Sequence, residues 1–500
     1  MELYVSEFSK YVITLLITLY TYECFAVFRY DNEEARNGIY IRQNILMFAF
    51  HFCSFLVICF ETGDFTYLFF YAFQQILLFT AIVLYRMVYP KANRLIMNNM
   101  CMLLSISFVI LTRLDMKKAV KQFIIVAGSL VIALLIPFLI EKIRFLKNLK
   151  WIYAAAGILA LSVVLILGQT TYGSKISYSI GGVTFQPSEF VKILFVFFVA
   201  SALYESSGFL DVFTTAVVAA AHVIVLVISK DLGSALIFFV VYVLMVYVAT
   251  KNLLYVAAGA GGGAAAAYIA FKVFRHVQVR VQAWKDPWSV IDSAGYQITQ
   301  SLFAISSGGF FGLGLYKGTP ESIPTVEADF IFSAIAEELG ILFAVCMILI
   351  CISCFIMFMN ISIRLNDKFY QLIAFGLGVT YIFQVFLTIG GGTKFIPLTG
   401  VTLPLISYGG SSVLTTLMMF AIVEGLYVLR QKEIEEQLHM KRHLRPGTPN
   451  GSGHRHRTAD RADRLERPCR PVRPSCDVDD DFIEDWDEPE NEGEEFEGEE

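Results

Sequence analysis

Residues 331–358 read IFSAIAEELGILFAVCMILICISCFIMF. The stretch is almost wholly apolar, and its only charged side chains are those of Glu337 and Glu338. An α-helix needs about 20 mainly apolar residues to cross the hydrocarbon core of a bilayer. The stretch therefore predicts a transmembrane helix that carries two acidic side chains.

Similar apolar runs follow one another along most of the chain. Hydrophobic residues make up 56% of the 500 residues, and the mean hydropathy is +0.60, which is far above the average of soluble domains. We expect an all-α fold, that of a polytopic integral membrane protein with about thirteen transmembrane helices. The predicted spans are 9–28, 43–60, 66–85, 98–113, 119–141, 149–168, 188–205, 211–229, 231–249, 253–274, 331–358, 368–390 and 405–429.

Lys and Arg in short loops indicate the orientation of the spans, because these residues gather on the cytoplasmic side. They occur in alternate connections, around Arg29, Arg36 and Arg42, Arg86, Lys91 and Arg94, Lys142, Arg144, Lys147 and Lys150, Lys251, Arg364 and Lys368, and Arg430. With thirteen spans, we expect the N-terminus outside and the C-terminal tail in the cytoplasm. Glu2 and Glu7 precede the first run and no small-residue cleavage site follows it, so we expect a retained helix.

Three segments lie outside the spans. The loops 169–187 and 275–330 fall on the outer side, and long ordered loops usually carry function. The tail at 431–500 is rich in Arg over 441–473 and almost wholly acidic over 477–500. Neither half of the tail can bury a core, so we expect disorder. The Arg-rich half either contacts anionic lipid headgroups or pairs with the acidic half.

Two motifs place charges at the edge of predicted spans. In the sequence FQPSEFVK at 185–192, Pro187 suits the first turn of a helix, and Glu189 and Lys192 lie on one helix face. This pair is either a structural ion pair or a site at which Lys192 meets a phosphate. Asp231 precedes another span and is expected to cap that helix.

The outer loop 275–330 combines aromatic, glycine and basic residues. Glycines at 308, 309, 312 and 314 either bring backbone N–H groups to a phosphate or form turns. Arg280, Lys285 and Lys317 are candidates for contact with an anionic headgroup. Asp329 lies where the loop meets the next span, and it is either a helix cap or, if burial raises its pKa, a general base.

Five motifs in this order resemble one known family. They are FQPSE at 185–189, DLGSA at 231–235, GYQ to SL at 295–302, DFIF with EELG at 329–340, and PLTGVTLPLISYGGSS at 397–412. The chain from about 98 to 430 closely resembles the shape, elongation, division and sporulation (SEDS) family, whose members include FtsW, RodA and SpoVE. Thr402, Leu403 and Pro404 make the last motif more similar to FtsW and SpoVE than to RodA.

The resemblance implies a peptidoglycan glycosyltransferase that polymerises lipid II at the outer face of the bacterial cytoplasmic membrane, with a class B penicillin-binding protein as transpeptidase partner. The family's essential outer-loop aspartate corresponds to Asp329, which would take a proton from the acceptor sugar hydroxyl. The sugar carbon would be inverted, and undecaprenyl pyrophosphate would leave. The candidate substrate contacts are Gln186, Glu189, Lys192, Arg280, Lys285, Tyr296, Gln297, Lys394, Ser407 and Tyr408.

This interpretation names no certain cofactor; a divalent cation, Mg²⁺ or Mn²⁺, would suit the pyrophosphate, but no cluster of ligands in the sequence demands one. The expected partners are lipid II, the penicillin-binding protein and membrane lipids, with no nucleic acid. We expect three extra helices over 1–97, a ten-helix core over 98–430 and a tail over 431–500. The role in division, elongation or sporulation stays open.

The chain also departs from the family pattern. The usual Arg-Trp pair of the first outer loop is replaced by Ile176 and Ser177, and the usual Pro-Glu-x-His-Thr by residues 324–328, PTVEA. Two alternatives therefore remain, a lipid II flippase and an inactive scaffold of the division or elongation machinery. A transporter needs charges along its whole path, whereas these motifs gather on the outer side, which favours surface chemistry.

Overall fold

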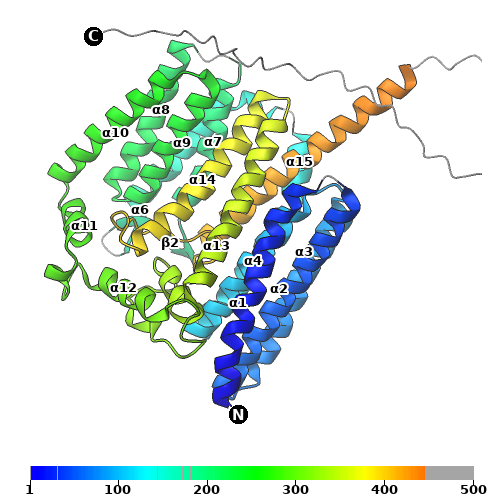
Figure 1. Ribbon diagram of the computed structural model, residues 1–500. Coiled ribbons are helices and arrows are strands. Elements are labelled where there is room, and N and C mark those ends of the chain that lie inside the picture. The colour runs from blue at the N-terminus through cyan, green and yellow to red at the C-terminus, as the bar shows by residue number, and fades with distance from the viewer. Residues whose placement is uncertain are drawn as a thin grey trace, which may run out of the picture. The chain divides into compact units, whose positions relative to one another are not determined.

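The computed structural model describes residues 2–444 apart from 31, 144, 172–173, 181–182 and 206–207. Within this part, each predicted apolar run lies on a helix (Figure 1). These helices are α1 (Glu2–Ala26), α2 (Glu33–Thr62), α3 (Thr66–Val88), α4 (Arg94–Leu114), α5 (Met116–Lys142), α6 (Lys150–Leu167), α7 (Pro187–Leu203), α8 (Phe209–Ile228), α9 (Leu232–Thr250), α10 (Leu253–Val273), α13 (Ile331–Arg364), α14 (Lys368–Gly392) and α15 (Gly410–Leu444). The all-α fold class is therefore confirmed.

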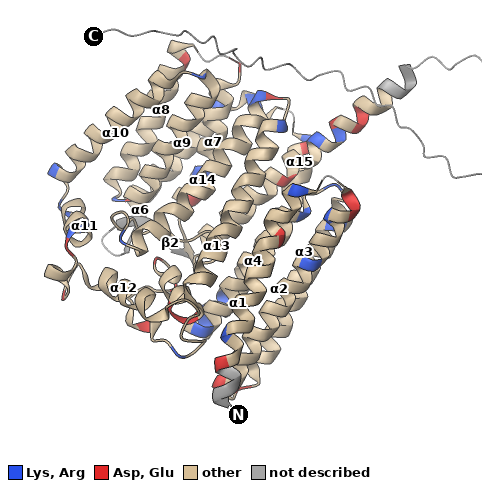
Figure 2. Ribbon diagram, in the orientation of Figure 1, with Lys and Arg blue, Asp and Glu red and all other residues tan. Residues whose placement is uncertain are grey.

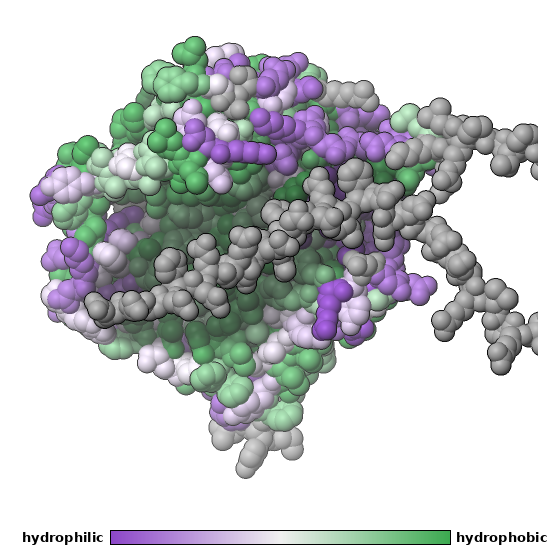
Figure 3. All heavy atoms as spheres, turned by 45° about the horizontal axis from the view of Figure 1, so that its top comes forward, coloured by the Kyte–Doolittle hydropathy of each residue, from purple (hydrophilic) through white to green (hydrophobic). Residues whose placement is uncertain are grey.

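Twelve helices of the described chain are long and apolar enough to cross a membrane. The remaining predicted span is α7, which has 17 residues. Charged residues gather at the two ends of the helix bundle (Figure 2), and hydrophilic patches border a hydrophobic surface (Figure 3). This distribution is that of helices whose middle parts face lipid tails.

The helix α4 forms the centre of the bundle, since nearly all of its side chains are buried. It packs against α2, α5 and α13. Tyr20 of α1 donates a hydrogen bond of 3.0 Å to Asn99 of α4, and Asn99 donates one of 3.2 Å to Ser353 of α13. Because no water reaches such groups in the bilayer core, these bonds fix the first helix against the bundle (Figure 1).

Both long loops contain secondary structure that the sequence patterns did not predict. The first holds a three-stranded antiparallel sheet of β1 (Gln169–Thr171), β2 (Ser174–Ile180) and β3 (Val183–Phe185). The second holds α11 (Arg275–Lys285) and α12 (Tyr296–Gly308). The 3-10 helices are η1 (Val27–Arg29), η2 (Leu146–Asn148), η3 (Trp288–Val290) and η4 (Pro320–Ser322). In Figure 1, α12 lies at the same end of the bundle as the N-terminus.

The last helix differs from its prediction at both ends. It begins at Gly410 rather than 405, because Leu405 has a left-handed φ of 64° and the preceding residues form an irregular loop. It continues to Leu444, so residues 431–444 are helical and the prediction of disorder was wrong for them. The rest of the tail, 445–500, lies outside the described residues.

Candidate functional site

Asp329 lies in the loop between α12 and α13, one residue before the helix cap. The cap of α13 is Phe330, and no side chain bonds the free N–H groups there. The prediction of Asp329 as a helix cap was therefore wrong. No hydrogen bond or ion pair joins the Asp329 carboxylate to another described residue, and its backbone N–H donates to the Thr325 carbonyl at 3.3 Å.

Arg280 of α11 lies close to Asp329 at a glycine of the loop between α14 and α15. Its Nη1 donates to the carbonyls of Leu398 and Thr399 at 3.3 and 3.2 Å. A Cβ added at Gly400 would lie 3.7 Å from Asp329 Oδ2 and 4.0 Å from Arg280 Nη2. Three segments far apart in the sequence thus meet at Gly400, whose φ of 73° suits glycine.

The surroundings of Asp329 give it an unusual acidity. Burial raises the pKa of its carboxyl group from 3.8 to about 6, the positive charge of Arg280 opposes this rise, and the negative charge of Glu327 adds to it. Burial also lowers the pKa of Arg280, against the opposite effect of Asp329 and Asp231. A carboxylate with a pKa near neutrality and no bonding partner can accept a proton from a bound hydroxyl.

Residues of the last motif hold the segment before Asp329 in place. Ser407 Oγ donates to the Ala328 carbonyl and accepts the N–H of Leu403, and the N–H of Tyr408 donates to the Glu327 carbonyl at 2.8 Å. Ser407 is only 1% exposed. Its hydroxyl therefore positions the loop rather than facing a substrate, whereas the Tyr408 side chain is half-buried.

Two other motifs meet beside this loop. Asp231 accepts hydrogen bonds from Ser188 Oγ at 3.0 Å and from Gln186 Nε2 at 3.4 Å, and it caps α9 through the N–H of Ser234 at 3.1 Å. The predicted cap is thus confirmed. A Cβ at Gly233 would lie 3.1 Å from the Thr399 carbonyl, so this glycine lets α9 approach the segment that Arg280 binds.

Lys192 and Glu189 form the predicted ion pair, with 2.8 Å between Nζ and Oε2. Lys192 also donates to Gln384 Oε1 at 2.7 Å, and Gln384 Nε2 donates to the Thr402 carbonyl at 3.1 Å. The Lys192 side chain is 1% exposed. Both of its partners are protein groups, so the structural interpretation is supported and contact with a phosphate is not.

The remaining predicted contacts lie on the loop surface. Lys285 is exposed and Lys394 half-buried, and no described acidic residue forms an ion pair with either. The indole N–H of Trp284 donates to the Lys394 carbonyl at 3.1 Å, which ties the end of α11 to the loop after α14. Tyr296, 39% exposed, and Gln297 begin α12 without a side-chain hydrogen bond to the described residues.

The glycines at 308–314 support a backbone turn. The N–H groups of Leu313 and Gly314 donate to the carbonyls of Glu337 and Glu338 at 3.0 and 2.9 Å. The loop therefore packs along α13 with these two amides occupied. The turn interpretation is confirmed, and the phosphate interpretation of this segment was wrong.

A buried charge cluster that the sequence reasoning missed stabilises the same loop. Arg113 of α4 donates to Glu338 at 2.8 Å, bonds Glu321, and stacks on the Tyr316 ring with 4.4 Å between its Cζ and the ring centroid. Glu338 belongs to the EELG motif inside α13. An arginine and a glutamate in separate apolar runs were the available signal for this pair, because buried charges need partners. Among the described residues, no group of three or more His, Cys, Asp or Glu could hold a metal ion.

Comparison with known proteins identifies relatives of this chain. The chain is 34% identical over 318 residues to the peptidoglycan glycosyltransferase RodA of Mycobacterium tuberculosis, covering 59% of this chain and 67% of that protein. It is 30% identical over 323 residues to the probable peptidoglycan glycosyltransferase FtsW of Bacillus subtilis, covering 61% and 80%. Both names occur among the relatives, so the preference for FtsW and SpoVE over RodA stays a prediction.

A solved structure shares the fold. It was described in work on the coordination of polymerization and crosslinking by a peptidoglycan synthase complex, and it matches with a TM-score of 0.58 at 24% identity, covering 68% of this chain and 98% of that one. Residues 86–432 match the sequence model of the FtsW, RodA and SpoVE cell cycle proteins. The chain therefore belongs to the FtsW/RodA/SpoVE family, as a multi-pass protein of the bacterial inner membrane.

Proposed function

We propose that the chain is a peptidoglycan glycosyltransferase that polymerises lipid II at the outer face of the cytoplasmic membrane, with Asp329 as general base. The observation that carries the proposal is the half-buried Asp329 carboxylate beside Arg280 and Gly400, with which no described residue forms a hydrogen bond or ion pair. Two relatives support it: the Mycobacterium tuberculosis protein is named a peptidoglycan glycosyltransferase, and the Bacillus subtilis protein a probable one.

In the proposed step, Asp329 takes the proton of an acceptor sugar hydroxyl as that oxygen attacks the anomeric carbon of the growing chain. A new carbon–oxygen bond forms, and the bond from the anomeric carbon to the pyrophosphate oxygen breaks. Undecaprenyl pyrophosphate leaves with the bonding electrons, and the carbon is inverted. The leaving group gains negative charge, which nearby cations stabilise.

Lys285 and Lys394 are the proposed cations for the pyrophosphate. Neither has an acidic partner among the described residues, and the bond from Trp284 to the Lys394 carbonyl links their segments. Arg280 has a different proposed role, because its Nη1 already bonds two carbonyls of the loop before Gly400. It positions this loop and keeps the Asp329 carboxylate charged near neutral pH.

The proposed orientation puts the Asp329 end of the bundle, and with it the N-terminus, outside, and the tail inside. Alternate Lys- and Arg-rich connections support it. A class B penicillin-binding protein is the proposed partner, supported by the fold shared with the peptidoglycan synthase complex.

The test uses the full chain purified with its cognate penicillin-binding protein and labelled lipid II. We expect polymer from the wild type and from Asp292→Asn, a control at an exposed carboxylate of the same loop, and none from Asp329→Ala. Polymer from Asp329→Ala would remove this residue from the mechanism. If the wild type makes no polymer but moves lipid II across vesicle membranes, the flippase alternative replaces the proposal. If it neither makes polymer nor moves lipid II but binds its partner, the scaffold alternative replaces the proposal.

A further inference from the structure

A polar cavity lies at the end of the bundle remote from Asp329. It has a volume of about 490 Å³. Its walls come from η1, the start of α2, the connection between α3 and α4, the last turns of α13 and the middle of α15. Since Asp329 precedes the first turn of α13, the length of this helix separates the cavity from the proposed catalytic site. The cavity also joins the three extra helices to the family core.

Cations dominate the cavity wall. The charged residues that line it are Glu33, Arg36, Lys91, Arg94, Arg364, Arg430 and Glu435. Among the described residues, Lys91 forms an ion pair with one lining carboxylate, that of Glu435. The excess of positive charge over two carboxylates favours an anionic ligand.

Three of these arginines form no ion pair with a described residue. Arg94 donates to the side-chain oxygen of Asn37, and Arg430 Nε donates to the backbone carbonyl of Arg364 at 2.8 Å. No described carboxylate forms an ion pair with Arg94, Arg364 or Arg430. The planar guanidinium group carries several donors in a fork that matches phosphate oxygens. The cavity thus offers phosphate-binding groups that the fold leaves without acidic partners.

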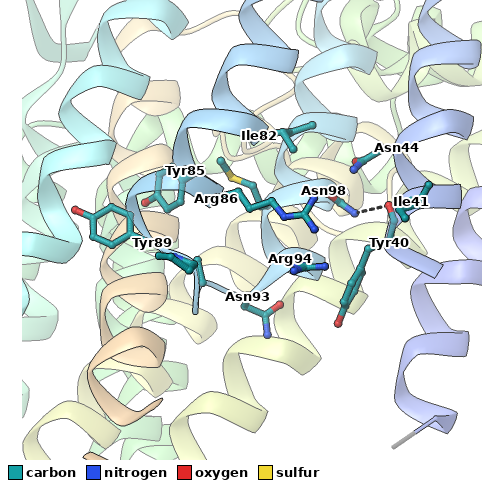
Figure 4. A pocket seen from close by; sticks show the side chains of 13 residues that line it. Tyr40, Ile41, Asn44, Ile82, Tyr85, Arg86, Tyr89, Asn93, Arg94 and Asn98 are labelled. Atoms are coloured by element: carbon teal, nitrogen blue, oxygen red, sulfur yellow. Dashed lines mark hydrogen bonds between the residues drawn. The ribbon is translucent and has the colours of Figure 1, made fainter. Parts of the chain in front are cut away.

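A second, smaller pocket adjoins the cavity and adds a partly apolar wall to it. It has a volume of about 40 Å³, and both pockets share Tyr40, Pro90, Ala92, Asn93 and Arg94 in their walls. Figure 4 shows Arg86, Arg94 and Asn98 around it, with Ile41 and Ile82 on facing helices. Ile41 is 55% exposed on the outer surface of α2. A polar chamber is therefore continuous with a partly apolar pocket at the bundle surface.

We propose that the joined pockets bind an anionic phospholipid, with its phosphate among Arg94, Arg364 and Arg430 and an acyl chain along the side of Ile41 and Ile82. A free phosphate compound would use the same arginines, but it would gain nothing from the apolar pocket. The headgroup would come from the leaflet that the basic loops face, where anionic lipids attract Lys and Arg. The bound lipid joins the extra helices to the core, independently of any glycosyltransferase activity.

The test is native mass spectrometry of the full-length protein in detergent with equal amounts of phosphatidylglycerol and phosphatidylcholine. We expect the wild type to retain phosphatidylglycerol selectively. Each basic residue near a membrane surface contributes about fivefold to the binding of anionic lipid, so Arg94→Gln with Arg364→Gln should weaken binding roughly 30-fold. Arg364→Gln alone, at an exposed position, should weaken it about fivefold.

The control is Lys142→Gln with Lys150→Gln, which removes two exposed charges from the ends of α5 and α6 outside the cavity wall. It should retain the wild-type selectivity. Equal losses in the control and the cavity variants, or no loss in either cavity variant, would overturn the proposal. If inorganic pyrophosphate stabilises the wild type against heat but not Arg364→Gln, while no lipid selectivity is seen, the ligand is a soluble phosphate and the lipid assignment is wrong.

Discussion

Glu189 and Asp329 are both carboxylates next to a basic side chain, but Glu189 is buried, Asp329 is half-buried, and their surroundings differ. Glu189 is paired with Lys192 at 2.8 Å, and Lys192 has a second partner in Gln384 at 2.7 Å. Asp329 lies near Arg280 without an ion pair, and Arg280 bonds backbone carbonyls instead. Removing one partner of a buried ion pair destabilises the fold, whereas a carboxylate without such a partner is available for chemistry.

The largest effect predicted by this difference is on catalysis. Asp329→Asn keeps the size of the side chain but removes its basicity, and general base catalysis commonly contributes 10²- to 10⁴-fold to a rate. We expect polymerisation of lipid II to fall by about this factor, with thermal unfolding in detergent changed little. A large loss of thermal stability together with activity would show that the Asp329 carboxylate serves the fold, as the Glu189 carboxylate does, rather than catalysis.

A substitution in the ion pair of Glu189 and Lys192 should instead act on the stability of the fold. Lys192→Met leaves the Glu189 carboxylate buried without its cation, and breaking a buried pair in this way costs about 3–5 kcal/mol. We expect a marked fall in the unfolding temperature. The double variant Glu189→Gln with Lys192→Met removes both charges and should recover part of that loss. If the single and double variants are equally destabilised, the charge of Glu189 is not the cause.

One half of this contrast was open to sequence reasoning, because it rests on local signals. Helices follow from apolar runs, and Glu189 and Lys192 are three residues apart on α7, so their pairing follows from helix geometry. Asp329 was found through motif resemblance. Its neighbours could not be found in this way, because Arg280 and Gly400 come from other segments and meet it only in the folded chain.

The wrong predictions have the same origin. A carboxylate next to a span is often a cap, but here the chain turns so that Phe330 occupies that position. Glycines near a charged loop suggest phosphate, but the amide of Gly314 faces the Glu338 carbonyl of α13. In both cases the local pattern was compatible with two structures, and tertiary packing selected between them.

The pH dependence of activity sharpens the comparison. With a pKa of about 6, Asp329 is mostly ionised at pH 7, and its basic form falls about tenfold for each pH unit below 6. We therefore expect the activity to fall as the pH is lowered below 6, which gives the pH profile an acidic limb. Arg280 opposes the raised pKa of Asp329, so Arg280→Gln should move the limb to higher pH. A limb that is unchanged in Arg280→Gln would mean that another group titrates.

The smallest predicted effect concerns the loop that positions Asp329. Ser407→Ala removes the hydroxyl that donates to the Ala328 carbonyl and accepts the N–H of Leu403. Such a bond contributes about 1 kcal/mol, so stability should fall only slightly. Because Ala328 precedes Asp329, we expect kcat to fall about tenfold with little change in KM.

Ser407→Thr is the matched variant, since it retains a hydroxyl, and it should recover most of kcat. A direct contact between Ser407 and substrate would instead raise KM, and the 1% exposure of this side chain argues against that outcome. If both variants change KM rather than kcat, Ser407 lines the substrate site and the loop needs no hydroxyl to hold Asp329. The effect on kcat alone therefore separates a residue that places the base from one that binds the sugar.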